Sequence, residues 1–410
     1  IMFLVINIIG LFVFLGIAVL FSRNRKNIQW TSIGILVLLN LVLAWFFIYF
    51  PWGRTGVQGL ANGIAWMIDS AHAGTGFAFA SWVKPGAMDM AVSALFPILL
   101  VVPLFDILMY LNVLPKVIGA IGWVLAKITR QPKFESFFGI EMMFLGNTEA
   151  LAVSNEQLKR MNETRVLTIA MMSMSSVSGA IVGAYVTMVP GELVLTAIPL
   201  NIINAIIVSS ILNPESVEEK EDIIYSIKNN EVERQPFFSF LGDSVLNAGK
   251  LVLIIIAFVI SFVALSDLLD RLINLFTGIV GGWIGVKGSF GLDQMLGTVM
   301  YPFALLLGLP FDEAWIVAQQ MAKKIVTNEF VVMGQIKDVI DSYSPHRKAV
   351  ITTFLISFAN FSTIGMIVGT LKGIVDQKTS DFVSKYVPMM LLAGILVSLM
   401  TAGFVGLFAW

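Results

Sequence analysis

The chain has 410 residues, of which 57% are hydrophobic and 13% are charged. Soluble domains carry about 25% charged residues, so this composition indicates a protein that lies in a lipid bilayer. The 26 lysines and arginines are balanced by 27 acidic residues, which leaves no broad basic surface to bind nucleic acid. The chain has no cysteine and only two histidines, so we expect neither disulfides nor a metal site.

Eight stretches are apolar over roughly the 20 residues that a membrane-spanning helix needs. They cover residues 2–21, 31–50, 90–112, 166–188, 192–212, 250–270, 348–371 and 386–408. The loops on one side of these spans hold more lysine and arginine than the loops on the other side. Because positive loops stay in the cytoplasm, we expect both termini on the outer face.

Two further apolar stretches, residues 134–163 and 294–342, are interrupted by polar residues. The interruptions are Gly146-Asn147-Thr148-Glu149 and Thr327-Asn328-Glu329. Backbone that leaves the helix at membrane depth is tolerated only where it is buried in protein or lines a wet cavity. We therefore predict two re-entrant helical hairpins whose tips lie at a polar cavity.

The segments that follow the two interruptions resemble each other. Residues 179–183 read GAIVG and residues 365–369 read GMIVG, and small or hydroxyl residues precede both. The expected orientation makes the first hairpin enter from the inside and the second from the outside, so the two copies are inverted. Inverted repeats with a midplane site at broken helices are typical of secondary transporters.

The predicted fold is that of an all-α polytopic membrane protein, with about eight transmembrane helices plus two re-entrant helical hairpins in an inverted repeat. Residues 51–88, which are rich in glycine and aromatic residues, are expected to form an outer loop. The predicted segments are N-terminal scaffold helices with this loop (1–112), an amphipathic interfacial helix (113–133), the first repeat with its hairpin, broken helix and scaffold helix (134–212), a cytoplasmic connector (213–249), a scaffold helix with an outer surface helix (250–293), the second hairpin and broken helix (294–371) and a C-terminal scaffold helix (372–410).

Glu149 and Glu329 are the most unusual side chains, because an ionisable group inside a membrane costs about 2.5–3.5 kcal/mol unless it finds partners or water. One alternative is that each glutamate caps a helix N-terminus at its hairpin break, where the helix dipole favours a negative charge. The other is that both face a substrate. The nearby side chains of Asn147, Thr148 and Asn360 suit a neutral polyhydroxyl or heterocyclic solute better than an anion.

Several other polar residues leave alternatives open. Lys323 and Lys324 are expected to snorkel or to pair with acidic neighbours. Ser175 and Ser176 either allow close helix packing or form part of a cation site. Glu135 and Glu141, beside the first hairpin, are candidates for either pairing or function.

An intramembrane hydrolase would need a serine–histidine pair or paired aspartates within the spans. Asp106 is the only aspartate well inside a predicted span, and neither histidine lies in one. We therefore expect the protein not to be an enzyme. A channel is a further alternative, which saturable and gradient-driven accumulation would distinguish from a carrier.

At these residues the chain resembles the concentrative nucleoside transporter family, from about residue 90 to the C-terminus. The landmarks are specific because they occur together and in order. They are ESFF at 135–138, GNTE at 146–149 where the family has G-Q-T-E, SSVSGAIVGAY at 175–185, NEF at 328–330, S-P-x-x-K-A at 344–349 and FANFSTIG at 358–365.

The resemblance implies a bacterial member of this family, located in the inner (cytoplasmic) membrane as a homotrimer in which each protomer has its own site. It implies that Asn147, Thr148 and Glu149 contact the nucleobase, that Glu329, Asn360 and Thr363 bind the ribose hydroxyls, and that Phe358 lies against the substrate. A buried carboxylate can accept both vicinal hydroxyls of a ribose, and such charge-assisted hydrogen bonds are strong.

Two departures from the family pattern matter. Asn147 stands where the family usually has Gln, which changes the base pocket and favours purine nucleosides. Met142 stands where sodium-coupled members have Asn, and a thioether is a poor ligand for a hard cation. The resemblance with these departures favours proton coupling over sodium coupling, with Glu149 or Glu329 as the titrating group and no other cofactor.

The sequence thus predicts a secondary active importer of nucleosides, coupled to proton symport by alternating access. Desolvation disfavours the ionised form of a carboxylate, so a buried glutamate can load a proton outside and release it inside. Sodium-coupled nucleoside symport, and a carrier or channel for another neutral polar solute, remain the alternatives.

Overall fold

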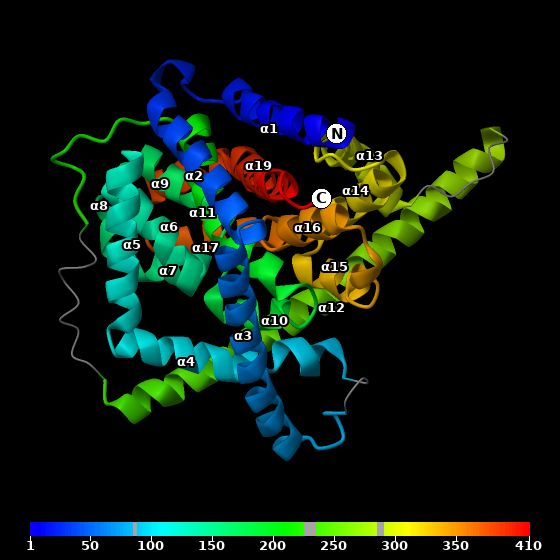
Figure 1. The fold of residues 1–410 in the computed structure, drawn as a ribbon, viewed down its shortest axis with the longest axis horizontal. Helices are drawn as coiled ribbons and strands as arrows, with labels where there is room; N and C mark the ends of the chain where they lie inside the picture. Colours follow the sequence, from blue (N-terminus) through cyan, green and yellow to red (C-terminus); the bar gives the residue numbers. More distant parts are fainter. Residues whose placement is uncertain (85–87, 225–234, 285–290) are drawn as a thin grey trace.

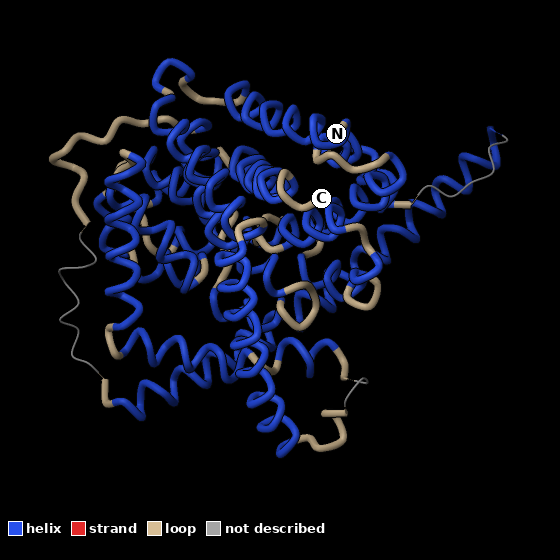
Figure 2. Tube along the Cα trace, viewed as in Figure 1, coloured by secondary structure: helices blue, strands red, loops and turns tan. Residues whose placement is uncertain are grey.

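The computed structural model describes residues 1–84, 88–224, 235–284 and 291–410. Within these ranges the chain consists of helices and loops without a β-strand (Figures 1 and 2). The prediction of an all-α fold is therefore confirmed.

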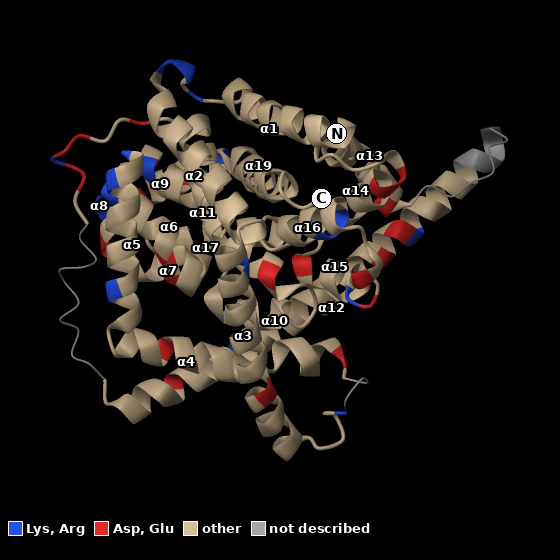
Figure 3. Ribbon diagram, in the orientation of Figure 1, with Lys and Arg blue, Asp and Glu red and all other residues tan. Residues whose placement is uncertain are grey.

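Among the described residues, six helical segments are long and apolar enough to cross a membrane. They are α1 (Met2–Leu20), α2 (Trp30–Ile48), Ala91–Tyr110 with α4 (Ile98–Tyr110) at its end, α11 (Gly191–Leu212), α12 (Phe237–Ile284, apolar to Ile279) and α19 (Val387–Gly406). Figure 3 shows α1 and α19 without a lysine, arginine, aspartate or glutamate. This pattern is that of a multi-pass membrane protein.

The other two predicted spans are helices broken in the middle. The first is divided into α9 (Glu163–Ser173) and α10 (Gly179–Tyr185), and the second into α16 (Pro345–Leu355) and α17 (Phe361–Lys372). Serine and asparagine side chains compete for backbone hydrogen bonds, so runs rich in them interrupt a helix. Asn360 illustrates this, because its side chain caps α17 by accepting a 3.0 Å hydrogen bond from the backbone N–H of Thr363.

Both hairpins break at the predicted polar interruptions. In the first hairpin, α6 (Lys133–Leu145) ends at Gly146, whose φ of 86° favours glycine, and α7 (Asn147–Val153) and α8 (Asn155–Arg160) follow. In the second, α14 (Phe311–Val326) is followed by α15 (Glu329–Ile336). The stretch predicted as one hairpin over 294–342 also holds part of a separate helix, α13 (Leu292–Leu306), which packs on α14.

The two helix breaks meet inside the protein. The backbone N–H of Phe358, in the second break, donates a 3.2 Å hydrogen bond to the carbonyl of Ser176 in the first. Gly394 of α19 lies against both breaks, because a Cβ added there would lie 2.8 Å from the Cβ of Ala359 and 3.2 Å from the Cβ of Met174. The unwound backbone of both repeats is therefore enclosed by protein, as membrane-depth backbone must be.

The expectation of an outer loop at residues 51–88 is wrong over most of its length. Residues 51–78 form α3 (Pro51–Ala78), a helix of 28 residues. One side of it is buried at Gly53, Val57, Ala61 and Ile68, a spacing that places these residues on one helical stripe. Its glycines lower helix propensity, so tertiary packing rather than local preference fixes this helix.

The boundaries predicted for the connector and the next scaffold helix are also wrong. Instead of a helix at 250–270 with a separate surface helix and loop, α12 runs unbroken for 48 residues from Phe237 to Ile284. Charged residues such as Asp243 and Asp270 interrupt its apolar run and suggest ends that the helix does not have. At 1.5 Å per residue α12 is about 72 Å long, so it tilts or extends beyond a hydrocarbon core of about 30 Å. It packs beside α4 (Figure 1).

Two further helices complete the described chain. α5 (Val113–Thr129) lies at the residues predicted for the amphipathic interfacial helix and packs on α6. α18 (Gln377–Lys385) precedes α19 and packs on α9.

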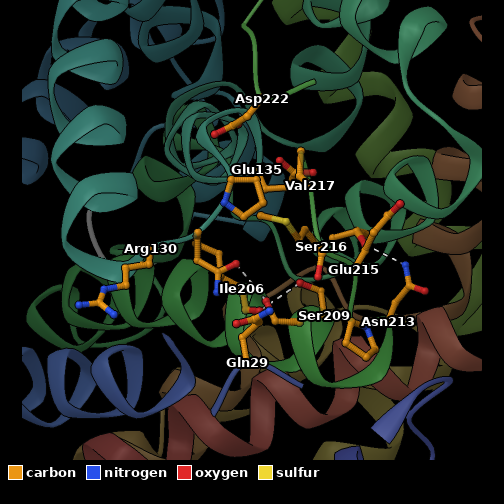
Figure 4. A pocket seen from close by; sticks show the side chains of 16 residues that line it. Gln29, Arg130, Glu135, Ile206, Ser209, Asn213, Glu215, Ser216, Val217 and Asp222 are labelled. Atoms are coloured by element: carbon orange, nitrogen blue, oxygen red, sulfur yellow. Dashed lines mark hydrogen bonds between the residues drawn. The ribbon is translucent and has the colours of Figure 1, made fainter. Parts of the chain in front are cut away.

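A polar junction joins residues 213–224 to the first repeat, beside the pocket drawn in Figure 4, which Asn213, Glu215, Asp222 and Glu135 help to line. At its centre the guanidinium of Arg165 donates two 2.8 Å hydrogen bonds to the carboxylate of Glu135. Both side chains are nearly buried, at 4% and 6% exposed. Arg165 also donates to the carbonyl of Glu221, and Asp222 accepts a 2.7 Å bond from the N–H of Lys133. Glu135 is therefore a pairing residue.

We expect Arg165→Met to lower the stability of the protein strongly, because it leaves the Glu135 carboxylate buried without its partner. Breaking a buried ion pair in this way costs about 3–5 kcal/mol. Thermal unfolding of the purified protein in detergent measures the effect. Lys159→Met is the control, since its pair with Glu156 is half exposed and such pairs contribute about 0–1 kcal/mol. Equal melting temperatures for the two variants would contradict this account of the junction.

Candidate functional site

Residues from both hairpins and both broken helices line one hollow beside α12. The lining residues are Leu145, Gly146, Asn147, Thr148, Glu149, Ser178, Ile181, Leu251, Ile254, Ile255, Phe258, Asn328, Glu329, Phe330, Phe358, Asn360, Ser362, Thr363 and Met366. All seven residues expected to contact a nucleoside are among them. Glu149 and Glu329, which are 180 positions apart in the sequence, thus border the same hollow.

The hollow is lined by both apolar and polar residues. Leu251, Ile255 and Phe258 of α12 provide apolar surface, and Phe358 adds an aromatic side chain from the second break. The hairpin tips and the helix breaks supply amides, hydroxyls and carboxylates. A mainly apolar pocket with a few fixed polar groups is the usual form of a small-molecule site.

Glu329 is the most firmly held acidic group in the hollow. Its side chain is only 3% exposed, Oε1 accepts a 2.8 Å hydrogen bond from the hydroxyl of Tyr185, and the amide of Asn360 lies 3.5 Å from Oε2. Glu329 is also the first residue of α15, where the helix dipole stabilises a negative charge. The side chain of Asn328 is the N-cap of α15, because it accepts from Val331 N–H, and the Glu329 carboxylate also interacts with the backbone at this helix start.

Tyr185 is a site residue that the sequence prediction missed. It is fully buried at the end of α10, and its ring packs on Phe330 with centroids 5.3 Å apart. Tyr185 is the last residue of the SSVSGAIVGAY run. A buried tyrosine hydroxyl needs a hydrogen-bond partner. A tyrosine at the end of this apolar run could therefore have been predicted to bond one of the buried glutamates.

The first hairpin contributes its own polar residues to the hollow. Glu149 is exposed to the hollow, and no hydrogen bond or ion pair within the described chain reaches its carboxylate. Its electrostatic neighbour is Asp106 of α4, which accepts a hydrogen bond from Ser244 of α12. Asn147 is buried; its Oδ1 accepts from Thr148 N–H at 2.7 Å and its amide lies 3.5 Å from the carbonyl of Ser173.

The second break is held by its own side chains. Oδ1 of Asn360 accepts hydrogen bonds from the N–H and the hydroxyl of Thr363, both at 3.0 Å, and from Ser362 at 2.7 Å. The hydroxyl of Thr363 also lies 2.5 Å from the carbonyl of Phe358. In this conformation Thr363 shapes the break and Asn360 faces Glu329, while Ser362 is an additional polar residue at the hollow.

The expected cation residues lie beside the hollow and do not line it. Ser175 and Ser176 are both fully buried at the break between α9 and α10. The hydroxyl of Ser176 donates to the carbonyl of Ser173 at 3.2 Å, whereas that of Ser175 has no hydrogen-bond partner among the described residues. Met142 is also fully buried, and it contributes a thioether where an oxygen ligand would be needed for a hard cation.

Comparison with known proteins identifies the kind of molecule that has this site. Residues 193–406 match the family described as Na+ dependent nucleoside transporter C-terminus, and residues 9–82 match its N-terminal counterpart. The chain is 44% identical to the purine nucleoside transport protein NupG of Bacillus subtilis over 100% of both chains. It is 28% identical to the nucleoside permease NupC of Helicobacter pylori, with 98% of this chain and 97% of that protein covered.

Solved structures show the same fold. CNTnw in an inward-facing substrate-bound state superposes with a TM-score of 0.89 at 26% identity, covering 99% of this chain and 98% of that one. An outward-facing variant of CNTnw gives a TM-score of 0.90 at 27% identity, covering 100% and 99%. The inverted repeat, the hairpins and the sequence matches agree, and the chain belongs to the concentrative nucleoside transporter family.

Proposed function

We propose that this protein is a secondary active importer of nucleosides that works by alternating access, coupled to protons. The observation that carries the proposal is the meeting of both hairpin tips and both helix breaks at one hollow with a buried carboxylate, Glu329. A site at the interface of two inverted repeats can be opened to either side of a membrane by moving one part against another.

Glu329 is assigned to the ribose. A carboxylate has about four acceptor sites, and Tyr185 and Asn360 use only part of that capacity. The remainder is available to the two vicinal hydroxyls of a ribose. Asn360 adds an amide at the same place, and the ring of Phe358 offers an apolar surface to the sugar or the base.

Asn147, Thr148 and Glu149 are assigned to the nucleobase, because they line the same hollow from the first hairpin. A base presents both donors and acceptors, which an amide, a hydroxyl and a carboxylate can match. Purine nucleosides are favoured because Asn147 is one methylene shorter than the family's usual Gln, and because a relative at 44% identity is named as a purine nucleoside transport protein.

The proposed coupling ion is H+, with Glu149 or Glu329 as its carrier. Two features support protons over sodium. Met142 offers sulfur in place of the oxygen ligand of sodium-coupled members, and the hydroxyl of Ser176 donates its hydrogen bond to the carbonyl of Ser173. Glu149 and Glu329 are both accessible from the substrate hollow, so binding of a nucleoside and of a proton can influence each other.

We further propose a homotrimer in the bacterial inner membrane. The support is the family resemblance together with the surface of α12, which exposes large apolar side chains along its length. Leu253, Ile260 and Leu272 are examples, at 69%, 64% and 52% exposed. α12 packs on α4 on one side, which leaves apolar surface for copies of the chain or lipid.

The first prediction concerns Glu329→Gln. We expect uptake of labelled adenosine into proteoliposomes to lose roughly 10- to 100-fold in apparent affinity, because charge-assisted hydrogen bonds of about 1.5–3 kcal/mol are weakened. Asp312→Asn, at the start of α14 and outside the hollow, serves as the control. Normal uptake by the Glu329 variant would disprove the ribose contact.

The second prediction concerns the base. Unlabelled purine nucleosides should inhibit adenosine uptake more strongly than uridine or cytidine does. Asn147→Gln should shift this preference toward pyrimidines by about tenfold, the usual effect of one methylene in a pocket. Competition curves for the wild type and the variant provide the measurement, and identical curves would refute the role of Asn147 in base selection.

The third prediction concerns coupling. With the outside acidic relative to the inside, nucleoside should accumulate, and collapsing the pH gradient should abolish accumulation with or without sodium. A sodium requirement that persists without a pH gradient would replace the proton by sodium. Uptake that rises linearly with concentration, without accumulation, would instead indicate a channel.

A further inference from the structure

Lys324 of α14 is the lysine with no exposed surface in the part of the chain that the structure describes. Its neighbour Lys323 behaves as the sequence predicts and forms a 2.9 Å ion pair with Asp293, at 22% and 38% side-chain exposure. Lys324 neither snorkels nor forms an ion pair within the described residues. An ammonium group in such a place is costly unless its donors are satisfied.

The ammonium of Lys324 is held by three oxygen atoms. Nζ donates hydrogen bonds to the hydroxyl of Ser357 at 3.1 Å, to the hydroxyl of Ser398 at 3.3 Å and to the carbonyl of Phe354 at 3.3 Å. It also lies 4.8 Å from the centre of the Phe354 ring. A lysine has three N–H donors, so this cage satisfies all of them.

The cage lies where two half-helices end. Phe354 is in the last turn of α16, whose final carbonyls have no partner within the helix, and Lys324 is in the last turn of α14. Both helix ends carry partial negative charge, which a cation stabilises. Through Ser398 the ammonium also reaches α19, so one side chain joins the second hairpin, the second break and a spanning helix.

The first repeat has no such cation at the corresponding place. Ser175 lies two residues after the end of α9, as Ser357 lies two residues after the end of α16. The hydroxyl of Ser357 receives the ammonium, whereas that of Ser175 is buried without a partner among the described residues. The two inverted copies therefore differ in charge at equivalent positions.

Glu329 follows Lys324 by five residues, across the tip of the hairpin. The two side chains are both buried, at 0% and 3% exposed, and they form no direct ion pair. Opposite charges in such a place are screened less than in water, so they attract each other without direct contact. The groups that hydrogen-bond the Glu329 carboxylate, Tyr185 and Asn360, are neutral. Lys324 is thus the positive charge that acts on Glu329 from within the second repeat.

We propose that Lys324 is a positioning residue, a buried cation that joins the second hairpin to the α16–α17 break and supplies a positive charge that favours the ionised form of Glu329, the form assigned to the ribose. It takes no part in contacting the substrate, since it does not line the hollow. The consequence is that the transported proton is carried by Glu149 rather than by Glu329. The substrate part of this inference rests on the proposed function, whereas the electrostatic part does not.

A double-mutant cycle on thermal stability tests the electrostatic part without any transport. Lys324→Met and Glu329→Gln are each expected to lower the melting temperature of the purified protein, because each leaves one buried charge without its counterpart. The loss of melting temperature in the double variant should be smaller than the sum of the losses in the two single variants. Lys323→Met is the matched control, and its shift should add to that of Glu329→Gln. If the melting-temperature shifts also add up for Lys324→Met with Glu329→Gln, the proposal that Lys324 is the countercharge of Glu329 is wrong.

Uptake by Lys324→Met tests the positioning role. The KM for adenosine should rise by about tenfold or more while Lys323→Met leaves it unchanged. Glu149→Gln, and not Glu329→Gln, should remove the dependence of accumulation on the pH gradient. If Lys324→Met cannot be purified, Ser398→Ala should raise KM in the same direction. An unchanged KM in either Lys324→Met or Ser398→Ala would overturn the proposal. Wild-type protein that carries no nucleoside would reject the proposed function and leave the stability cycle standing.

Discussion

The constraint on which the structure depends is that backbone freed from a helix inside a membrane must find polar partners in the protein. In this chain the freed segments are placed against one another. The break after α9 and the break after α16 share a hydrogen bond between Ser176 and Phe358, and α19 approaches both of them at Gly394. The polar centre that results is shielded from lipid, so hydroxyls, amides and carboxylates can be kept there. The substrate hollow is the accessible side of this centre.

The two repeats have the same order of elements, but their buried glutamates have different neighbours. The second repeat carries Glu329 with an ordered set of donors, and Lys324 provides a positive charge behind it. The first repeat carries Glu149 with no described hydrogen bond, and its electrostatic neighbour is another carboxylate, Asp106. A fixed carboxylate suits recognition of a substrate that must be bound in every cycle. A carboxylate without fixed partners suits a group that gains and loses a proton. The proposed roles of the two glutamates, substrate binding for Glu329 and proton transfer for Glu149, rest on these surroundings.

The positions of both hairpin tips can be predicted from the sequence, because Gly146–Glu149 and Thr327–Glu329 are polar interruptions of apolar stretches. Such a pattern predicts both hairpin tips and, with the repeat, their meeting at one hollow. Other parts depend on packing that no local pattern shows. The glycine-rich residues of α3 become helical only because one stripe of them is buried, and α12 continues through charged positions where its apolar run ends. Tyr185 and Lys324 find their partners through contacts between segments far apart in the chain.

The central claim is that the buried carboxylate of Glu329 recognises the vicinal hydroxyls of a nucleoside. Equilibrium binding of adenosine and of its 2′,3′-dideoxy analogue to the purified protein tests it most directly. The account predicts that the dideoxy analogue binds at least about a hundredfold more weakly, because the carboxylate and Asn360 are left without their partners. Equal affinities for the two compounds would contradict the account.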